Sequence, residues 1–257
     1  MTESLSGLRV LMLRSPRPGD PLAARLRSRG AGVDTLPLLR IEPRPLPDAA
    51  LTEAAANADK WLFVSRHAVR HGLGQLAAAG LLRSGIPTFA VGAATAAALH
   101  DDWGITARYP PDANTEGLLR LPELQSVAGE TILIFRGVGG RDALRVGLSA
   151  RGARVRYCEV YARVPEPRRV PELAAALAAP GALLLVAHSG EVVRALAAAV
   201  ARVQVLNRPL PACLVPGERV ADIARRLGFA PVVAASALAA EMEQALCRWY
   251  TPERFRT

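Results

Sequence analysis

An internal repeat limits the folds open to this sequence more than any other feature. Residues 9–38 align without gaps on residues 131–160, at an offset of 122 positions. Residues 65–73 match residues 189–197 at an offset of 124. Further along, Gly92 corresponds to Gly217, at an offset of 125. Two copies with small differences in loop length produce such a slowly drifting offset. We therefore predict two similar units of about 120 residues each.

Both copies alternate short apolar runs with alanine-rich segments of helix length. The predicted strands are residues 9–14, 33–38, 60–65, 87–92, 105–110, 131–136, 155–162, 182–187, 212–217 and 231–235. Apolar strands separated by helices are typical of parallel sheets that are covered on both faces. The predicted fold class is therefore α/β, with two similar parallel-sheet domains.

Two proline-rich stretches, residues 38–48 and 161–171, occupy equivalent places just after the second strand of each copy. We expect each to begin as a strand and to continue extended, because successive prolines exclude a helix. As a pair of linkers they favour hinged motion around a cleft between two domains. The predicted division is residues 1–38 plus 169–257 as one discontinuous domain, residues 44–160 as an inserted domain, and residues 39–43 and 161–168 as linker strands.

The chain of 257 residues carries a formal net charge of +9, and all its basic residues except Lys60 are arginines. Two explanations stay open: GC-rich codon usage, or a polyanionic partner that guanidinium groups bind. The arginines are scattered without a run of four or more basic residues, and only 5% of the residues are aromatic. A small ligand with several anionic groups is therefore favoured over nucleic acid.

The three cysteines, Cys158, Cys213 and Cys247, lie far apart and form no CxxC pair, so we interpret them as buried, reduced thiols. Together with four scattered histidines they suggest no metal site. The N-terminus has no basic segment followed by an apolar core, and Pro180–Gly181 interrupts the longest uncharged stretch. We expect a soluble, cytoplasmic protein without a signal peptide or a membrane span.

The stretch FRGVGGRDAL, residues 135–144, looks at first like a phosphate-binding loop. However, a dinucleotide fingerprint needs a glycine where Asp142 stands, and a Walker loop needs a Gly-Lys-Ser/Thr sequence that is absent. Both copies share a strand that ends in arginine, Arg14 or Arg136, followed by a loop and a helix start. This pattern predicts a generic anion site. The alternative is that the glycines only form a tight turn.

Ser65 and Ser189 each follow an apolar strand and open a helix, so each is first of all a candidate N-cap. Gly92 and Gly217 occupy strand-to-helix turns, where a glycine lets the backbone approach a ligand closely. Thr95 either caps its helix or donates a hydroxyl group to the ligand. In each domain these loops fall at the carboxyl ends of parallel strands, where open α/β sheets bind ligands.

Together, these segments resemble the uroporphyrinogen-III synthase family. The likeness runs over nearly the whole chain and includes VLMLRSP, DKWLFVSRHAV, PTFAVGAATAAAL, ANTEGLL, LLLVAHSGEVVRAL and GERVADIARRLGF. The most specific segment is residues 132–165, an R-G-x-G-G-R loop followed by a V-x-x-x-x-V-Y strand. The resemblance implies two HemD-like domains joined by a two-stranded linker, with both termini in one domain and with no metal or organic cofactor.

The resemblance also implies a reaction. Hydroxymethylbilane, a linear tetrapyrrole with carboxylate arms, is closed to uroporphyrinogen III with inversion of the last ring and loss of water. Tyr161, on the second linker strand, matches the family's candidate general acid, and a tyrosine that only packs at an interface is the alternative. The substrate-binding candidates are Arg14, Ser65, Arg66, Gly92, Ala93, Thr95, Arg136, Gly137, Gly139, Gly140, Arg141, Ser189, Gly190, Gly217 and Arg219. The resemblance further suggests a monomer, and we expect no nucleic-acid or membrane partner.

Two positions depart from the family pattern. Val220 stands where a threonine is common, so a hydroxyl contact is missing there or Arg219 replaces it. His188 precedes Ser189, where small or hydroxyl residues are common, and it is either a proton carrier near the cleft or a structural histidine. The alternative function is a non-catalytic module that binds a tetrapyrrole or another polyanion.

Overall fold

The computed structural model describes residues 4–17, 19–46, 49–203 and 209–250. The chain divides into two compact units: unit 1 is Met1–Arg40 with Pro165–Thr257, and unit 2 is Ile41–Val164. The chain leaves unit 1 within strand β3 (Leu39–Pro43) and returns at the end of β7 (Arg154–Pro165). Both divisions fall inside the segments predicted as linker strands. That the two units move as hinged domains around a cleft stays a prediction.

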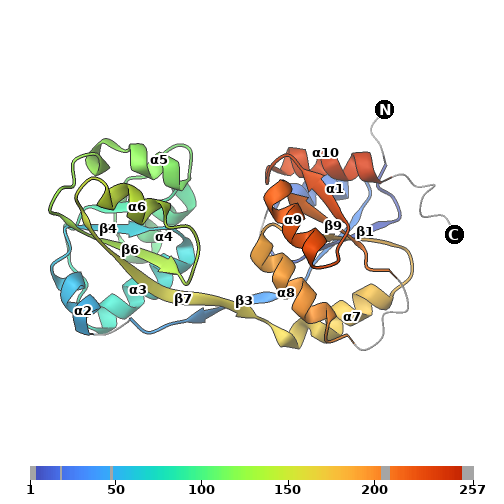
Figure 1. The fold of residues 1–257 in the computed structure, drawn as a ribbon, viewed down its shortest axis with the longest axis horizontal. Helices are drawn as coiled ribbons and strands as arrows, with labels where there is room; N and C mark the ends of the chain where they lie inside the picture. Colours follow the sequence, from blue (N-terminus) through green and yellow to red (C-terminus); the bar gives the residue numbers. More distant parts are fainter. Residues whose placement is uncertain (1–3, 18, 47–48, 204–208, 251–257) are drawn as a thin grey trace. The chain divides into compact units, whose positions relative to one another are not determined.

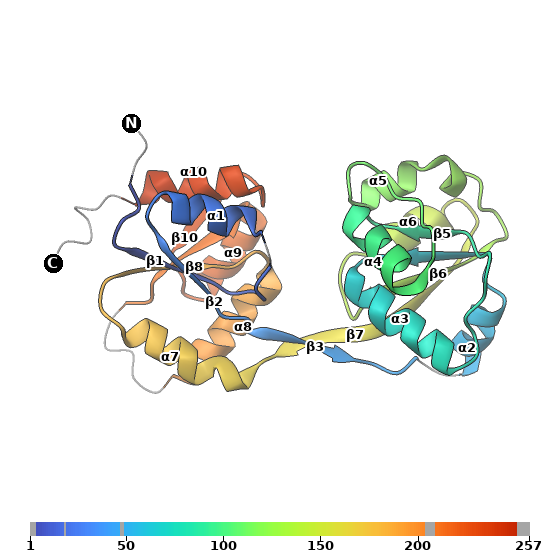
Figure 2. The same ribbon diagram turned by 180° about the vertical axis from the view of Figure 1, so that it is seen from behind.

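Unit 1 is built on a parallel sheet with the strand order β10-β9-β8-β1-β2. Its strands are β1 (Leu8–Met12), β2 (Gly32–Thr35), β8 (Ala182–Val186), β9 (Ala212–Pro216) and β10 (Pro231–Ala234). One face packs against α1 (Pro21–Ser28) and α10 (Ala239–Trp249), and the other against α7 (Val170–Ala178), α8 (Gly190–Val200) and α9 (Glu218–Arg226). Figures 1 and 2 show these two helical layers from opposite sides.

Unit 2 has a sheet with the order β3-β7-β6-β4-β5, in which β5, β4, β6 and β7 are parallel. Its remaining strands are β4 (Lys60–Phe63), β5 (Thr88–Ala90) and β6 (Thr131–Gly137). Helices α2 (Ala49–Ala56), α3 (Arg66–Ala78) and α4 (Ala93–Trp103) cover one face, and α5 (Thr115–Arg120) and α6 (Ala143–Ser149) cover the other (Figure 2). Leu73 and Phe135 belong to the apolar core between the sheet and α2, α3 and α4. Ile134 and Leu148 belong to the core on the other face, under α5 and α6.

Strand β3 is antiparallel to β7. The N–H of Arg44 donates to the carbonyl of Val160 at 3.0 Å, and the N–H of Glu166 donates to the carbonyl of Leu38 at 2.9 Å. From one bond to the other, the position on the β3 side moves back along the chain by as many residues as the position on the β7 side moves forward. This is the pattern of an antiparallel pair. The two-stranded connection is therefore a hydrogen-bonded ribbon.

The strand orders confirm the internal repeat. By the sequence alignment, β1 and β2 of unit 1 correspond to β6 and β7 of unit 2, and β8 and β9 correspond to β4 and β5. The order β9-β8-β1-β2 is then the same as the order β5-β4-β6-β7. The predicted fold class, two similar parallel α/β units, is confirmed.

Two expectations about extended segments are wrong. Residues 105–110 form only an isolated parallel bridge between Arg108 and Phe89, because Pro110 and Pro111 have no N–H groups to continue the ladder. Residues 167–171 are not extended: a 3₁₀ turn covers Pro167–Arg169, and α7 starts at Val170. Proline is compatible with the first turn of a helix, where its missing N–H would have no partner.

The described cysteines are free and buried, as predicted. Burial raises the pKa of both the Cys158 and the Cys213 thiol to about 12. In the part of the chain that the structure describes, no helix is long and apolar enough to cross a membrane.

Candidate active site

The carboxyl edge of the unit 2 sheet collects most of the predicted residues of that unit. Ser65 follows β4, Gly92 follows β5, and the glycine loop, residues 137–141, continues from β6. Because these three strands are parallel neighbours, their ends meet at one edge of the sheet. Tyr161 joins them from β7, where it lies beside Gly137.

Ser65 has two roles in this geometry. Its Oγ accepts a hydrogen bond from the N–H of Ala68 at 3.0 Å, so it is the N-cap of α3 as predicted. The same oxygen lies 3.0 Å from the hydroxyl of Tyr161, at hydrogen-bond distance. The serine therefore ties the start of α3 to β7.

Tyr161 is 1% exposed and is held on several sides. Arg163 Nη2 donates to its hydroxyl at 3.4 Å, at the long end of the hydrogen-bond range. Gly137 lies against its ring: a Cβ added at this glycine would lie 2.7 Å from ring atoms Cε2 and Cζ. The glycine is therefore required by the close approach of the tyrosine.

The glycine loop is folded around Arg136, which is 7% exposed. Arg136 Nε donates to the carbonyl of Gly137 at 3.2 Å, and Nη1 donates to that of Arg141 at 3.4 Å. Its guanidinium also lies 4.3 Å from the centre of the Tyr157 ring, a cation–π contact. Arg136 thus holds the loop in shape from inside.

Two glycines of this loop have backbone angles that favour glycine. Gly139 has φ 75° and Gly140 has φ 94°, both in the left-handed region. The loop therefore makes the tight turn that was one of the two sequence interpretations. It also borders a pocket, so the second interpretation, an anion site, stays a proposal. Arg141, at the end of the loop, forms an ion pair with Glu116 at 3.1 Å.

A pocket of about 390 Å³ brings the glycine loop and Tyr161 together. Its lining includes Arg136, Gly137, Gly139, Gly140, Arg141, Tyr161 and Arg163. Six of these were sequence candidates, and Arg163 was not. The volume falls in the lower part of the range of ligand sites.

The turn after β5 adds Gly92, Ala93 and Thr95 to the same sheet edge. Gly92 is extended, with φ 179°, yet a Cβ there would lie 2.6 Å from the Cβ of Ala113. Gly92, not Thr95, is the N-cap residue of α4, and the side chain of Thr95 is buried in the first turn at 4% exposure. The capping role considered for Thr95 is therefore wrong, whereas Ala93 is exposed.

Sequence reasoning missed a group of basic side chains beside Tyr161. The ring of His67 lies 5.6 Å from the Tyr161 ring, and that of His71 lies 6.2 Å from it, measured between centroids. Arg66, which was predicted, precedes His67 and is exposed. The spacing of His67 and His71, four residues apart after a helix-opening serine, is the signal that could have indicated a shared helical face.

Unit 1 repeats part of this arrangement at its own sheet edge. Arg14 forms an ion pair with Asp20, the N-cap of α1, as Arg136 does with Asp142 at 3.8 Å, just before α6. Asp20 and Asp142 are equivalent in the repeat. The predicted anion-binding arginine of unit 1 therefore already has an acidic partner.

His188 lies next to this ion pair. Burial, followed by the charge of Arg14, lowers its pKa to about 4. Its Nδ1 is buried and has no hydrogen-bond partner among the described residues. A histidine in this state is neutral at physiological pH.

The remaining unit 1 candidates stand at the starts of α8 and α9. Ser189 accepts from the N–H of Val192 at 3.4 Å and is the N-cap of α8, as predicted. A Cβ at Gly190 would lie 2.4 Å from Cδ1 of Ile223, so this glycine serves close helix packing. Gly217 has φ 75°, and Arg219 is exposed. These residues belong to a different unit from the pocket beside Tyr161.

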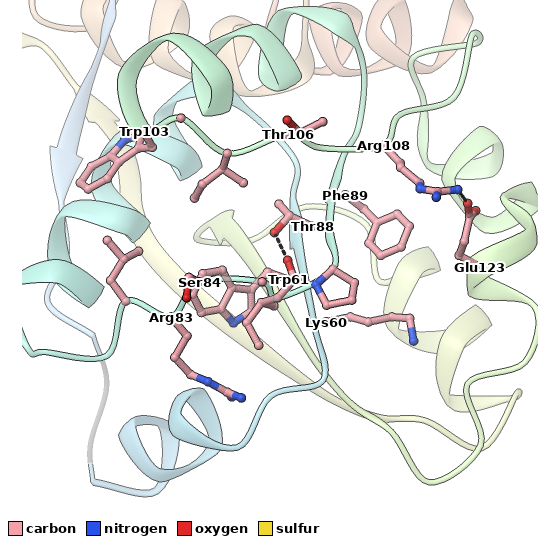
Figure 3. A pocket seen from close by; sticks show the side chains of 16 residues that line it. Lys60, Trp61, Arg83, Ser84, Thr88, Phe89, Trp103, Thr106, Arg108 and Glu123 are labelled. Carbon is pink, nitrogen blue, oxygen red and sulfur yellow. Dashed lines mark hydrogen bonds and ion pairs between the residues drawn. The ribbon is translucent and has the colours of Figure 1, made fainter.

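A larger pocket, of about 1070 Å³, lies at the opposite edge of the unit 2 sheet (Figure 3). It contains none of the predicted site residues. Its charged groups already have partners within the protein: Lys60 pairs with Glu130, Arg108 pairs with Glu123, and Arg83 donates to the carbonyls of Ala56 and Ala58. The polar groups of this pocket therefore give little reason to place the reaction there.

No group of three or more histidine, cysteine, aspartate or glutamate side chains that could hold a metal ion occurs among the described residues. The fold and the site define a protein of two similar parallel α/β units, with strand-end loops and basic side chains gathered at the carboxyl edge of each sheet.

Comparison with known proteins identifies the family. The family model for uroporphyrinogen-III synthase HemD matches residues 20–242. The chain is 38% identical over 226 residues to uroporphyrinogen-III synthase of Salmonella typhimurium and 37% identical to that of Escherichia coli. Each match covers 86% of this chain and 92% of the relative. The chain therefore belongs to the uroporphyrinogen-III synthase family.

A solved structure agrees in fold. Uroporphyrinogen-III synthetase from Helicobacter pylori is 15% identical with a TM-score of 0.64, and the match covers 94% of this chain and 99% of that one. At this identity the likeness shows the fold alone.

Proposed function

We propose that this protein closes hydroxymethylbilane to uroporphyrinogen III, with inversion of the last pyrrole ring and loss of water. The observation that carries this proposal is the pocket beside Tyr161, in which a buried hydroxyl meets a glycine loop in a chain of this family. Such a site combines a proton donor with backbone N–H groups and guanidinium groups that suit carboxylate arms.

Tyr161 is the proposed proton donor to the departing hydroxyl of the substrate. When that hydroxyl leaves as water, the terminal pyrrole becomes an azafulvene cation. The cation then closes through a spiro intermediate that fragments and closes again on the other carbon. Ser65 Oγ at 3.0 Å supports this role, because a serine O–H that donates to the tyrosine oxygen leaves the phenol proton free to point elsewhere. The repeat supports it too: the equivalent of Tyr161 is Leu39, so the fold symmetry does not require the hydroxyl.

Positioning contributes most of the proposed catalysis. Direct closure to the type I isomer needs no enzyme, so the protein must hold the reacting ring in the geometry of the spiro intermediate. We propose that the predicted substrate-binding residues contact the carboxylate arms and thereby fix the tetrapyrrole. Arg66 is an exposed cation suited to this task. Arg141 is also exposed, and a carboxylate arm would replace Glu116 as its partner, whereas Arg136 and Arg14 act mainly by shaping their loops.

We further propose that the protein acts as a cytoplasmic monomer, with no nucleic-acid partner. The buried free thiols are compatible with a reducing compartment.

The test is a coupled assay with freshly generated hydroxymethylbilane, followed by oxidation and chromatographic separation of type I and type III uroporphyrins. Type III product above the spontaneous type I background supports the synthase. Type I product alone, at the uncatalysed rate and from folded protein, contradicts it and favours a module that only binds a polyanion.

A further inference from the structure

The first two turns of α3 carry four basic side chains, and two of them, His67 and His71, lie near the Tyr161 ring. His67 and His71 are four residues apart and so share one face of the helix. Their rings lie 6.5 Å apart between centroids and are nearly parallel, with an angle of 15°. Both rings lie near the Tyr161 ring, with centroid distances of 5.6 and 6.2 Å.

A third basic group comes from β7. The guanidinium of Arg163 lies 5.6 Å from the centre of the Tyr161 ring and donates to its hydroxyl at 3.4 Å. Arg163 also lines the pocket that contains the glycine loop. Tyr161 is thus near basic groups of two elements of unit 2: the guanidinium of Arg163 contacts its hydroxyl, and the imidazoles of His67 and His71 lie near its ring.

The charged groups that shift the pKa of these two imidazoles are all basic. Loss of solvent lowers the pKa of His67, and the charged groups that lower it further are His71 and Arg163, then Arg66 and Arg70. The pKa of His71 is lowered by burial and by Arg70, and Arg44 borders the same groove beside it.

No acid is among the groups that shift the pKa of His67 or His71. Glu42, on the neighbouring strand β3, is not among the groups that shift either histidine. The N-terminus of α3 is itself positive, which disfavours added cations there.

Such a cluster is suited to an anion. A carboxylate placed against it would relieve the repulsion among the basic groups and would favour the protonated imidazole. A carboxylate that contacts both an arginine and a histidine gains charge-assisted hydrogen bonds from each.

We propose that His67, His71 and Arg163 form a carboxylate subsite beside Tyr161, and that His67 takes up a proton when a carboxylate arm binds there. The proton comes from the buffer, and the bound arm stays ionised. This inference rests on the proposed function for the identity of its ligand, and it gives the substrate a fixed arm next to the proposed proton donor.

Isothermal titration calorimetry with uroporphyrinogen III, kept free of oxygen, measures this proton directly. Titrations at neutral pH in phosphate and in Tris differ in heat by the number of protons exchanged, because the two buffers have different ionisation enthalpies. We expect the wild-type protein to take up about half a proton or more, since a carboxylate at contact raises a pKa by about 1–3 units.

The variants are His67→Gln and the double variant His67→Gln, His71→Gln, which keep polar side chains but cannot be protonated. We expect proton uptake to disappear in the double variant and binding to weaken by about tenfold, the effect of losing a charge-assisted hydrogen bond. His100→Gln is the matched control, because His100 is an exposed histidine of α4 in the same unit and is outside the cluster. It should behave like the wild type.

The outcomes separate this inference from the proposed function. If the wild type binds with the same heat in both buffers, or if the double variant keeps the wild-type uptake, the subsite is overturned even where type III product is formed. Failure of the wild type to bind the product at all overturns it as well. Uptake that disappears in the double variant and persists in His100→Gln supports it, even if Tyr161 proves not to be the proton donor.

Discussion

The hydroxyl of Tyr161 lies 3.0 Å from Oγ of Ser65, although the two residues are 96 positions apart in the chain. Tyr161 lies within β7, beside the last residue of β6. Ser65 opens α3, the helix that follows β4, and β4 is the next strand but one from β7 in the sheet. Because the serine oxygen is fixed by the N–H of Ala68, it provides a stationary partner for the tyrosine. The proposed proton donor is therefore held in place by a residue of a second element.

Replacing Ser65 tests the contact. Ser65→Ala removes both the N-cap and the partner of Tyr161, so we expect a loss of about 1 kcal/mol in stability and about a tenfold lower kcat. Ser65→Thr keeps a hydroxyl and should recover most of both. The measurements are urea unfolding and the rate of type III product. A Ser65→Ala variant with wild-type kcat would show that the hydrogen bond does not serve the reaction.

Gly137→Ala tests the packing under the tyrosine. The new methyl group would lie 2.7 Å from the Tyr161 ring, so the ring or the strand must shift, and we expect type III formation to fall by about 100-fold. Gly74→Ala is the matched control, because this helical glycine has no atom within 4 Å of the added Cβ. It should keep full activity and gain up to about 1 kcal/mol. Equal activity of the two variants would contradict the packing argument.

His188→Val tests the pH dependence of stability. The repeat places valine, Val64, at the equivalent position, so the substitution suits the fold. Burial lowers the pKa of His188 from 6.5 to about 4, so the unfolded chain binds a proton that the folded protein does not. The wild type therefore loses stability relative to the variant as the pH falls from about 6.5 to about 4, by roughly 3 kcal/mol in all. Above pH 6.5 this difference should be constant. Urea unfolding at several pH values measures it, and a pH-independent difference would contradict the burial of a neutral imidazole.

The thiols of Cys213 and Cys158 test the packing of an apolar core in unit 1 and in unit 2, respectively. Because burial raises the pKa of Cys158 and Cys213 to about 12, neither forms a thiolate at mildly alkaline pH. We expect iodoacetamide to leave both unmodified in the native protein and to modify them in urea, as measured by mass spectrometry. Rapid labelling of either residue without denaturant would show that its unit is packed differently.

Much of the fold could be predicted from the sequence, because the apolar runs indicate which segments form buried strands and the repeat indicates that the two units are alike. The failures have local causes. Residues 105–110 read as a strand, but prolines limit them to one bridge. Residues 167–171 read as extended, yet proline is compatible with the start of α7.

The site was harder to predict because its contacts join distant parts of the chain. The sequence placed Ser65 and Tyr161 in the right elements, but their hydrogen bond depends on the pairing of β7 with β6 and on the position of α3. Arg136 read as an anion-binding residue, whereas the carbonyl groups that it binds inside its own loop cannot be deduced from spacing. Arg163 and the two histidines carry no motif, so only the fold brings them to the tyrosine.

In the proposed reaction the hydroxyl of Tyr161 donates the proton that releases water from the substrate. The most direct measurement is the rate of type III uroporphyrinogen formation by Tyr161→Phe, compared with the wild type and with Tyr109→Phe, an exposed tyrosine of the same unit. We predict that Tyr161→Phe folds normally and forms type III product at least about 100-fold more slowly, so that spontaneous type I product dominates, while Tyr109→Phe matches the wild type. A Tyr161→Phe protein that forms type III product at the wild-type rate would show that the Tyr161 hydroxyl is not the proton donor.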